Sequence, residues 1–546
     1  MTSSVKSNVK ERIADALFEV KVLHEAGIVG PVRPDKGARI ATTFLRWGAS
    51  PATGSATAAI HYPHETALID ERGSLSFEQV HRRSNALAHA FAKMGIGYGD
   101  GIGVMCRNHR GFIETTLAAA KLGASALYLN TMFAGPQLIE VMRREGPKAL
   151  VYDEEFAGLL EGVDEGVERI VGWADSDTAA QTIDSLVAAN DDSNLKPPPD
   201  KPRFVILTSG TTGTPKGAQR SSPDGLLALA ALIDRIPYRS REKMVVAAPL
   251  FHSWGFFHFV ISLPTASTLI LRRRFDPEET LRAIEKHRAQ VLGAVPVMVQ
   301  RILQLPDETL SSYDLSSLRI TSLSGSALPG ELAIEWMDRF GDTIYNLYGS
   351  TEVAYATVAT PEDLRAAPGT AGRPPRGTVV RLYDESGKEV PRGEVGRIFV
   401  GNEMSFEGYT GGGGKEAIGG LLCSGDVGHL DAAGRLFIDG RDDEMIVSGG
   451  ENVFPREVED LLADHEAVVE VAVIGIEDEE FGQRLKAFVV LGEAEATEDD
   501  LKAHVKANLA SYKTPREVEF LDELPRNATG KVLKRELRER ETQEPA

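Results

Sequence analysis

The pattern of apolar and polar residues alternates between helix-like and strand-like segments over the first part of the chain. Residues 73–100 predict a capped amphipathic helix between two turns. Residues 101–108 predict a short strand, and residues 112–130 predict a helix that leads into another strand. Because strands that alternate with helices build parallel sheets covered by helices, this pattern predicts an α/β fold.

The pattern changes toward the C-terminus. Glycine rises over residues 370–440, where short alternating strands predict a small β-rich subdomain. Residues 445–546 then alternate between helix and strand patterns in a compact unit. The predicted fold class is α/β: a large N-terminal domain of helix-covered parallel sheets with a small β-rich subdomain, and a small mobile α+β C-terminal domain.

The first amphipathic segment, residues 8–25, carries Ile13, Leu17, Val20 and Leu23 on one helical face. Two interpretations fit this face: docking onto the main body, which we favour, or contact with a membrane surface. The longest apolar run, residues 226–233, is far shorter than the ~20 residues of a membrane span. The sequence therefore predicts no transmembrane segment and leaves a peripheral membrane contact open.

Composition and charge narrow the class of protein. The 546 residues are 42% hydrophobic and 26% charged, which is typical of globular proteins. The formal charge of −20 argues against non-specific binding to nucleic acid or to anionic membranes, since both need a basic surface. Small anionic ligands remain compatible, because a few cations dominate a local site.

The two cysteines, Cys106 and Cys423, provide neither a disulfide framework nor a zinc site by themselves. Their neighbours are apolar or small, which favours core packing. The N-terminus lacks the basic-then-apolar order of a signal peptide. We therefore expect a reducing, cytoplasmic setting.

A loop of glycine, serine and threonine directly follows the predicted buried strand at residues 203–207. Its sequence is Thr208-Ser209-Gly210-Thr211-Thr212-Gly213-Thr214-Pro215-Lys216-Gly217. Small residues let backbone N–H groups surround an anion, hydroxyls add donors, and the lysine adds charge. It departs from a Walker P-loop at Pro215 and Gly217, so it predicts a phosphate loop of another type.

This loop resembles the signature loop of the adenylate-forming superfamily, which includes acyl-CoA synthetases, luciferase and adenylation domains. Further motifs occur in the order typical of that family and extend the resemblance over about residues 60–540. They are PLFHSWGF (249–256), SLSGSALP (322–329), YGSTE (348–352), SGDVGHLD (424–431), GRDDEMIVSGGENVFPREVE (440–459) and PRNATGKVLKREL (525–537).

The resemblance implies specific roles at the nucleotide. Tyr348 would stack on adenine, Thr351 would contact phosphate, and Glu352 would bind Mg²⁺. Asp426 would accept both ribose hydroxyls, and Arg441 would contact ribose or phosphate. The implied ATP/AMP-binding set is Thr208, Ser209, Gly210, Thr211, Thr212, Gly213, Lys216, Gly325, Ser326, Ala327, Tyr348, Gly349, Ser350, Thr351, Glu352, Asp426, Arg441 and Lys531. Leu421 and Ser424 depart from the family's usual aromatic residue and threonine.

The reaction implied has two steps. A carboxylate attacks the α-phosphorus of MgATP to give acyl-AMP and pyrophosphate, and the thiol of coenzyme A then displaces AMP. Catalysis would come from Thr208, Lys216, Glu352 and Lys531, because fixed cations and donors stabilise charge on phosphate oxygens. No protein nucleophile is needed.

The family changes steps by rotating its C-terminal domain. By resemblance, residues 1–440 form the AMP-binding domain, residues 441–444 the hinge with Asp443, and residues 445–546 the mobile domain. In the second step the loop Ser448-Gly449-Gly450-Glu451 would replace Lys531 and line the CoA path.

The acidity of the chain is concentrated in this last domain. From Asp443 onward there are 26 acidic and 13 basic residues, yet Arg526–Arg540 holds six basic residues against two acidic ones. The sequence therefore predicts a basic island around Lys531 at the edge that meets ATP.

The expected acyl pocket is mostly apolar and consists of His252, Phe256, Val297, Gly325 and Ala327. Phe256 matches the position of an aromatic gate in some long-chain enzymes. We expect an acyl-CoA synthetase for medium- or long-chain fatty acids. The alternatives are an aryl or cyclic carboxylate CoA ligase and, less favoured, a non-catalytic homologue. The sequence does not indicate chain length or oligomeric state.

Overall fold

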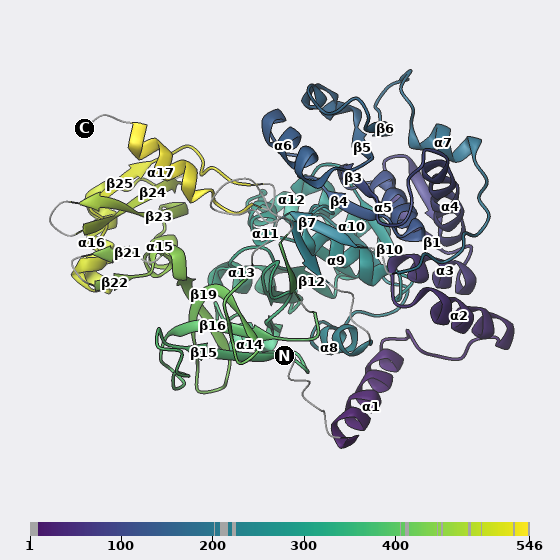
Figure 1. Cartoon of the computed structure of the whole chain (residues 1–546). Helices are drawn as coiled ribbons and strands as arrows, with labels where there is room; N and C mark the ends of the chain where they lie inside the picture. The colour runs from purple at the N-terminus through teal and green to yellow at the C-terminus, as the bar shows by residue number, and fades with distance from the viewer. Residues whose placement is uncertain are drawn as a thin grey trace.

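The computed structural model describes most of the chain. The described residues are 9–200, 203–207, 217–220, 225–404, 406–409, 414–444, 446–448, 451–478, 482–492, 494–527 and 530–543. Four sheets organise them, two large and two small. In Figure 1 the helix-covered body lies on the right and the C-terminal domain on the left.

The first large sheet has eight strands in the order β14-β13-β12-β11-β9-β10-β1-β2. Its six inner strands are parallel, and β2 and β14 add antiparallel edges. The strands are β1 (Thr66–Asp70), β2 (Gly73–Ser76), β9 (Lys243–Val246), β10 (Thr268–Leu271), β11 (Val291–Ala294), β12 (Ile320–Leu323), β13 (Ile344–Tyr348) and β14 (Thr357–Ala359). Strands β10, β11 and β12 are buried at every position, as parallel strands covered on both faces require.

The second large sheet has seven strands in the order β17-β8-β7-β4-β3-β5-β6. Strands β7 to β6 are parallel, while β8 and β17 are antiparallel. The strands are β3 (Gly101–Met105), β4 (Ser125–Tyr128), β5 (Ala149–Asp153), β6 (Glu168–Trp173), β7 (Phe204–Leu207), β8 (Gly217–Arg220) and β17 (Phe406–Tyr409). The predicted parallel α/β fold is confirmed.

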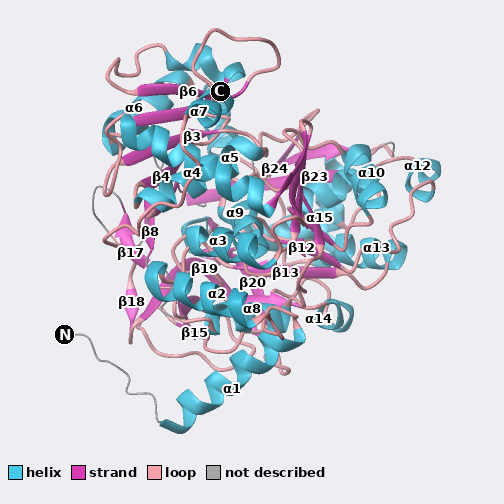
Figure 2. Cartoon of the chain, turned by 90° about the vertical axis from the view of Figure 1, so that its right-hand side faces the viewer, coloured by secondary structure: helices cyan, strands magenta, loops and turns pink. Residues whose placement is uncertain are grey.

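Helices pack between and around the two large sheets. Figure 2 shows α3, α4, α5 and α9 between them, and one apolar core continues across both. Helix α4 begins at a capping box in which Ser76 and Gln79 bond each other's backbone N–H groups. The helices of the body are α1 (Val9–Glu25), α2 (Pro34–Trp47), α3 (Pro51–His61), α4 (Phe77–Lys93), α5 (Arg110–Leu122), α6 (Gly135–Glu145), α7 (Ile183–Ala189), α8 (Leu227–Arg235), α9 (Ser253–Ser262), α10 (Pro277–His287), α11 (Pro296–Leu303), α12 (Asp307–Ser311), α13 (Gly330–Phe340) and α14 (Pro361–Ala366).

The predicted β-rich subdomain forms a separate antiparallel sheet. It contains β15 (Val379–Tyr383), β16 (Gly396–Gly401), β18 (Ala417–Ile418), β19 (Leu421–Leu430) and β20 (Leu436–Arg441). The short 3-10 helix η2 (Asp442–Glu444) follows β20 and leads to the last domain.

The C-terminal domain has one sheet in the order β22-β21-β24-β23, and β25 pairs parallel with β24. Its elements are β21 (Ile446–Ser448), β22 (Glu451–Val453), α15 (Pro455–Ala463), β23 (Val468–Asp478), β24 (Gly482–Leu491), α16 (Glu498–Asn508), β25 (Glu517–Phe520) and α17 (Lys534–Gln543). The domain has its own apolar clusters, so it folds around a core separate from that of the body.

Helix α1 docks in a way that the sequence pattern did not predict. Leu23 is buried with Val22 against the main core, whereas Ile13, Leu17 and Val20 point into solvent. The favoured expectation that this helix docks onto the body is met, but of the four residues on the predicted face only Leu23 is buried. The pattern identified an apolar face, but the body contacts it only at Leu23 and binds this segment also through Val22 and Ala26, which lie outside that set.

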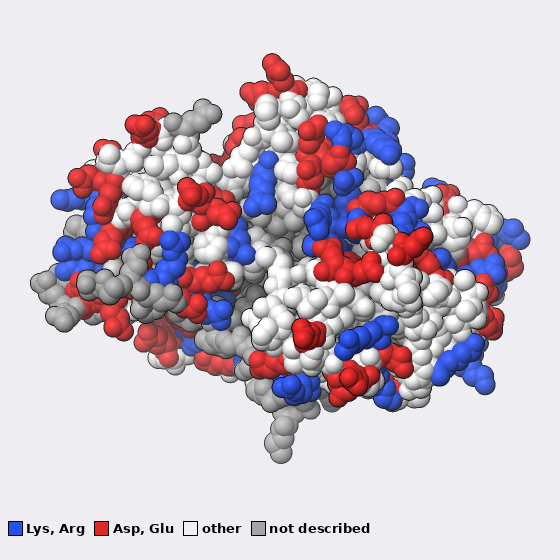
Figure 3. All heavy atoms as spheres, turned by 90° about the horizontal axis from the view of Figure 1, so that it is seen from above, with Lys and Arg blue, Asp and Glu red and all other residues white. Residues whose placement is uncertain are grey.

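Three further features concern the surface charge, the two cysteines and the length and apolarity of the helices. Acidic and basic side chains are interspersed over the face in Figure 3. Cys106 and Cys423 are both buried and free, as expected. Within the described ranges, no helix is both long and apolar enough to cross a membrane.

Candidate active site

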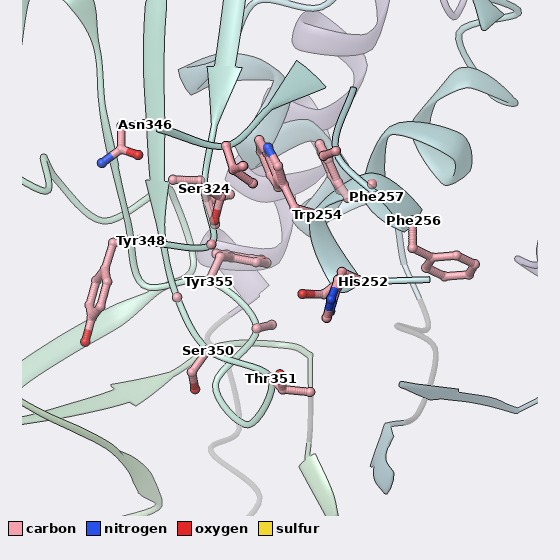
Figure 4. A pocket seen from close by; sticks show the side chains of 18 of the residues that line it. His252, Trp254, Phe256, Phe257, Ser324, Asn346, Tyr348, Ser350, Thr351 and Tyr355 are labelled. Carbon is pink, nitrogen blue, oxygen red and sulfur yellow. The ribbon is translucent and has the colours of Figure 1, made fainter. Parts of the chain in front are cut away.

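A continuous cavity of about 1400 Å³ lies where the carboxyl ends of β9, β11, β12 and β13 meet the β-rich subdomain and the C-terminal domain. Ligand sites of parallel α/β sheets lie at this edge. Figure 4 shows Tyr348 on one side of the pocket, His252, Trp254 and Phe256 on the other, and Ser350 and Thr351 at its lower rim. The cavity therefore joins a polar end to an apolar end.

Part of the expected site lies outside the described residues. This applies to the phosphate loop, residues 208–216, and to Gly449 and Gly450. The strand before the loop is described, and its last residue, Leu207, lines the cavity.

The YGSTE turn brings a carboxylate to the cavity. Gly349 is required here, because a Cβ at this position would lie 2.2 Å from the carbonyl oxygen of Ala354. After this tight approach, the Ser350 hydroxyl donates to Glu352 Oε2 at 3.0 Å. Tyr409 from β17 donates to Glu352 Oε1 at 2.6 Å. The carboxylate is thereby oriented by two hydroxyl groups.

Glu352 fits the chemistry of a magnesium ligand. Its carboxylate lines the cavity, and each oxygen keeps a further lone pair after accepting one hydrogen bond. Burial, followed by the adjacent Glu352 carboxylate, raises the pKa of Tyr409. Tyr409 thus stays a hydroxyl donor at neutral pH. It was missed by sequence reasoning, which had no signal linking β17 to the YGSTE turn.

A second polar cluster joins β13 to the β-rich sheet. Asp426 and Arg441 are direct partners across β19 and β20, and their side chains pair at 3.5 Å. Tyr348 donates its hydroxyl hydrogen to Asp426 Oδ2 at 2.5 Å, and Ser424 Oγ lies 3.2 Å from the Tyr348 oxygen. Burial and the neighbouring Asp426 raise the pKa of Tyr348. All three predicted residues thus lie in one hydrogen-bonded group.

Asn346 adds a residue that sequence reasoning missed. It precedes Tyr348 by two positions on β13, so both side chains project from the same face of the strand. The Asn346 side-chain oxygen is buried without a hydrogen-bond partner among the described residues, and Asn346 lines the cavity. A buried acceptor without a partner is suited to an amino group of a ligand. The spacing of two from Tyr348 was the available signal.

The apolar end contains the residues expected for the acyl group. His252, Phe256, Val297, Gly325 and Ala327 all line the cavity. The Nε2 atom of His252 is buried and has no partner among the described residues. Burial lowers the pKa of His252 to about 4, so its ring is neutral at pH 7.

Phe256 packs within an aromatic group. Its ring centroid lies 5.0 Å from that of Tyr128 and 5.4 Å from that of Phe204, next to the start of the phosphate loop. These distances are typical of favourable tilted ring contacts. A role for Phe256 as a gate stays a prediction.

Trp254 forms the back wall of this end and was missed from sequence. Its indole N–H donates to the carbonyl oxygens of Ala294, at 3.0 Å, and Ser322, at 3.2 Å. Ala294 ends β11, and Ser322 lies in the neighbouring strand β12. Trp254 therefore fixes α9 against β11 and β12. Next to it, burial lowers the pKa of His258 to about 4.

Lys531 enters the cavity from the C-terminal domain. The preceding Gly530 approaches α11 so closely that a Cβ on it would lie 2.1 Å from Val297 Cγ1. Asn527 accepts the Lys531 backbone N–H at 2.9 Å and fixes the turn. Lys531 thus lies beside the acyl-pocket residue Val297.

The charges around Lys531 differ from the expected basic island. Arg526 pairs with Glu470 at 3.1 Å, and Lys534 pairs with Glu444 and Glu459. Within the part of the chain that the structure describes, no carboxylate pairs with Lys531. The expectation of an island was wrong because sequence counting cannot see carboxylates supplied by β23, α15 and η2.

Of the expected hinge and CoA residues, Ser448 is the one whose side chain the structure describes, and it is not among the residues that line the cavity. Asp443 lies in η2, and Ser448 is buried at the end of β21, opposite Glu451 across the β21–β22 pair. The neighbouring Glu444 does line the cavity. This arrangement places the Lys531 loop, and not Ser448, at the reacting end.

Among the residues that the structure describes, one other group has metal-ligand geometry: Cys106, His109 and Asp153, all buried. His109 Nε2 bonds Asp153 Oδ1 at 2.7 Å, and its Nδ1 accepts the backbone N–H of Gly111. Both ring nitrogens are therefore already engaged, and the group is a hydrogen-bonded part of the core.

A polar end with tyrosine, aspartate and arginine, an apolar end, and a lysine supplied by a second domain define an enzyme that activates carboxylic acids with a nucleotide. Comparison with known families agrees. Residues 56–410 match the model described as "AMP-binding enzyme", and residues 457–531 match "AMP-binding enzyme C-terminal domain". The chain belongs to the AMP-binding enzyme family and is an adenylate-forming ligase.

Relatives and solved structures support this membership. A feruloyl-CoA synthase of an Amycolatopsis species is 34% identical over 88% of this chain and 96% of its own length. A long-chain-fatty-acid–CoA ligase of Mycobacterium tuberculosis is 29% identical over 85% and 93%. The crystal structure of an anthranilate CoA ligase with anthranoyl-AMP is 26% identical, with a TM-score of 0.81 over 90% of this chain and 97% of that chain.

Proposed function

We propose that this enzyme converts a medium- or long-chain fatty acid to its acyl-CoA thioester, through acyl-AMP, with release of pyrophosphate and AMP. ATP and coenzyme A are the co-substrates. The observation that carries the proposal is the length of the apolar end. Beyond His252 and Phe256 the cavity continues between α3, α8 and α9 and reaches Ile40 and Phe44 of α2. An extended hydrocarbon chain suits this shape.

The first step brings two anions together at the polar end. The substrate carboxylate attacks the α-phosphorus in line and expels pyrophosphate. Lys531, which has no carboxylate partner among the described residues, would neutralise the approaching carboxylate and the α-phosphate. Tyr348 would carry the adenine, and Asp426 the ribose. Glu352 would hold Mg²⁺, which neutralises the phosphate charge when bound.

The neutral state of His252 matters at the acyl end. A neutral imidazole adds no charge to an apolar surface, and its buried Nε2 offers a single polar contact near the carboxylate. The hydrocarbon part then lies against aromatic and aliphatic side chains. Each CH₂ group that moves from water into such surroundings contributes roughly 0.8 kcal/mol to the binding free energy, so longer chains bind more tightly.

The second step needs a path for the CoA thiol. We propose that residues 441–444 are the hinge between an N-terminal domain, residues 1–440, and a C-terminal domain, residues 445–546. Rotation at Asp443 would withdraw Lys531 and bring Ser448 and Glu451 to the cavity. The thiolate then attacks the acyl carbonyl, the acyl–phosphate bond breaks, and AMP leaves.

An aryl carboxylate is the second candidate substrate. It is favoured by the names of two relatives, a feruloyl-CoA synthase and an anthranilate CoA ligase. An aryl acid would occupy the space near His252, Trp254 and Phe256 and leave the far part of the cavity empty. The two candidates therefore differ in how activity depends on chain length.

A substrate panel tests the proposal. AMP release is measured with ATP, CoA and straight-chain acids of rising length, in parallel with benzoates, cinnamates and indole acids. We expect kcat/KM to rise with chain length. Benzoates or cinnamates faster than all alkanoates would select the aryl candidate. Absence of pyrophosphate release with every acid, in a preparation that binds ATP, would show a non-catalytic homologue.

A further inference from the structure

The N-terminal helices carry an unusual concentration of exposed apolar side chains. Among the described residues, seven of the fourteen large hydrophobic side chains that are exposed lie between positions 13 and 45. They are Ile13, Leu17, Val20, Val29, Val32, Phe44 and Leu45. Figures 1 and 2 both show α1 reaching away from the body at one edge, beside α2. Such clustering marks a contact surface rather than scattered exposure.

Helix α2 is divided into an apolar half and a cationic half. At 100° per residue, its apolar and glycine positions occupy one continuous arc, namely Gly37, Ala38, Ile40, Ala41, Phe44, Leu45 and Trp47. The opposite arc holds Asp35, Lys36, Arg39, Thr42, Thr43 and Arg46. No residue of α2 is buried, although half of the helix is apolar. Packing onto the body therefore does not account for its pattern.

The apolar arc is continuous with the acyl cavity. Val29, Ile40 and Phe44 line the cavity, whereas Leu45, 85% exposed, lies on the outer edge of the same arc. On α1, Leu17 is 67% exposed. An apolar surface thus extends from outside the molecule into the space assigned to the substrate tail.

We propose that α1 and α2 form a docking surface for a lipid bilayer, next to the mouth of the acyl cavity. Helices that lie in a bilayer interface combine a strongly amphipathic pattern, cations on the polar face and low mean hydropathy, and α2 has all three. A stretch of this length lies on the membrane and does not cross it.

The charge of α2 indicates which lipids the docking surface would contact. Arg39 and Arg46 are exposed, and no carboxylate in the described ranges pairs with either. The chain as a whole has a charge of −20, which argued against anionic membranes. That argument holds for the whole surface but not for residues 33–46, which carry four cations and one carboxylate, Asp35. Anionic lipids are therefore the partner that this local surface fits.

The position of the docking surface, next to the mouth of the acyl cavity, gives it a use in substrate uptake. Fatty acids partition into bilayers, so an enzyme seated on the bilayer takes its substrate without exposing the chain to water. This use rests on the proposed function, whereas the docking itself does not. Residues 9–47 precede the match to the AMP-binding enzyme model, which begins at residue 56, so the surface lies outside the matched part of the chain.

Co-sedimentation with vesicles tests the docking. The full-length enzyme is mixed with phosphatidylcholine vesicles, either pure or containing one quarter phosphatidylglycerol. We expect the wild type to bind both and to prefer the anionic vesicles. Leu17→Glu/Leu45→Glu should lower the partition constant at least about a hundredfold, because two leucine side chains lose their apolar contact. Neither residue lines the cavity.

A charge variant and a matched control complete the design. Arg39→Glu/Arg46→Glu should weaken binding to anionic vesicles at least about 25-fold and leave binding to pure phosphatidylcholine nearly unchanged. Val379→Glu/Val395→Glu adds the same two charges at exposed valines of the β-rich subdomain and should not change binding. Absence of wild-type binding to both vesicle types, or an equal loss in the valine control, would overturn the proposal.

Two further measurements distinguish lipid docking from dimer formation and from a failure of the proposed function. If the surface joins two copies of this chain, sedimentation equilibrium without lipid will show a dimer that Leu17→Glu/Leu45→Glu dissociates, and the lipid proposal is then wrong. AMP release with a water-soluble acid should be equal in wild type and this variant. Vesicle binding without any fatty-acid activity would leave the docking supported and the proposed substrate wrong.

Discussion

The close approach of Gly530 to Val297 gives a sharp prediction about the catalytic arrangement of the two domains. A Cβ on Gly530 would lie 2.1 Å from Val297 Cγ1, far inside van der Waals contact. The Gly530→Ala substitution should therefore disfavour the arrangement in which Lys531 enters the cavity. If the second step uses a different arrangement, that step should be spared.

The magnitude follows from the type of clash. Insertion of a methyl group into a packed contact typically costs about 1–3 kcal/mol. The positive φ of Gly530, +75°, adds a backbone cost, but that cost is present in both arrangements and affects mainly the stability of the C-terminal domain. The clash alone should slow adenylation about 5- to 150-fold.

Two half-reactions provide the assay. Pyrophosphate release from acid and ATP reports adenylation, and thioester formation from synthetic acyl-AMP and CoA reports the second step. Val297→Ala should restore most adenylation to the Gly530→Ala enzyme, because it removes the methyl group that the new Cβ meets. Gly434→Ala is the matched control: Gly434 also has a positive φ, +77°, but nothing lies within 4 Å of its Cβ position.

The reasoning is refuted by any of three results. Equal losses in both half-reactions would show that the contact does not belong to one step alone. A double variant no more active in adenylation than Gly530→Ala would show that the collision with Val297 is not the cause. A loss in Gly434→Ala comparable to that of Gly530→Ala would point to general backbone strain.

Three further predictions follow from the site. Lys531→Ala should lower adenylation about 100-fold or more and leave thioester formation from acyl-AMP largely intact, and comparable losses in both would contradict its assigned role. Tyr409→Phe removes a donor to Glu352 and should raise the Mg²⁺ concentration for half-maximal activity about tenfold, measured by Mg²⁺ titration of pyrophosphate release. Burial lowers the pKa of His258 to about 4, below the ~6.5 of a histidine in an unfolded chain. The unfolded state therefore binds more protons than the folded state, so the free energy of unfolding falls as pH drops from about 6.5 to 4. His258→Gln should remove about 1.2 kcal/mol of that loss in urea unfolding between pH 6 and 5, and an unchanged slope would show that His258 does not titrate on unfolding.

Much of the fold could be predicted because its signals are local. The capped helix after residue 73, the strand at 101–108 and the helix that follows each depend on spacing within one segment. The C-terminal elements were predicted for the same reason: α15, β23, β24 and α16 lie within residues 445–546, where the sequence alternates between helix and strand patterns. The spacing of apolar residues is sufficient to predict a helix or strand when one face of that element packs against one apolar core.

The residues that were missed depend on distant neighbours. Trp254 matters because its N–H reaches the ends of β11 and β12, about 40 and 68 positions away. Tyr409 is defined by its bond to Glu352, 57 positions away. No spacing rule connects such pairs, because only the order of strands in the sheets brings them together. The docking of α1 was predicted but most of the residues involved were not, since periodicity shows that a face is apolar but not what covers it.

The placement of charge explains how so acidic a protein can receive a polyanionic nucleotide. The carboxylates of Glu470, Glu444 and Glu459 neutralise Arg526 and Lys534, so the segment around Lys531 presents no broad positive field. Lys531, which has no carboxylate partner among the described residues, lines the cavity. Gly530, which precedes Lys531, contacts Val297, so under the proposed function Lys531 would supply its charge to the cavity only while the C-terminal domain is seated there. Under the proposed rotation, the charge that Lys531 supplies would depend on domain position, which suits a two-step reaction with opposing electrostatic needs.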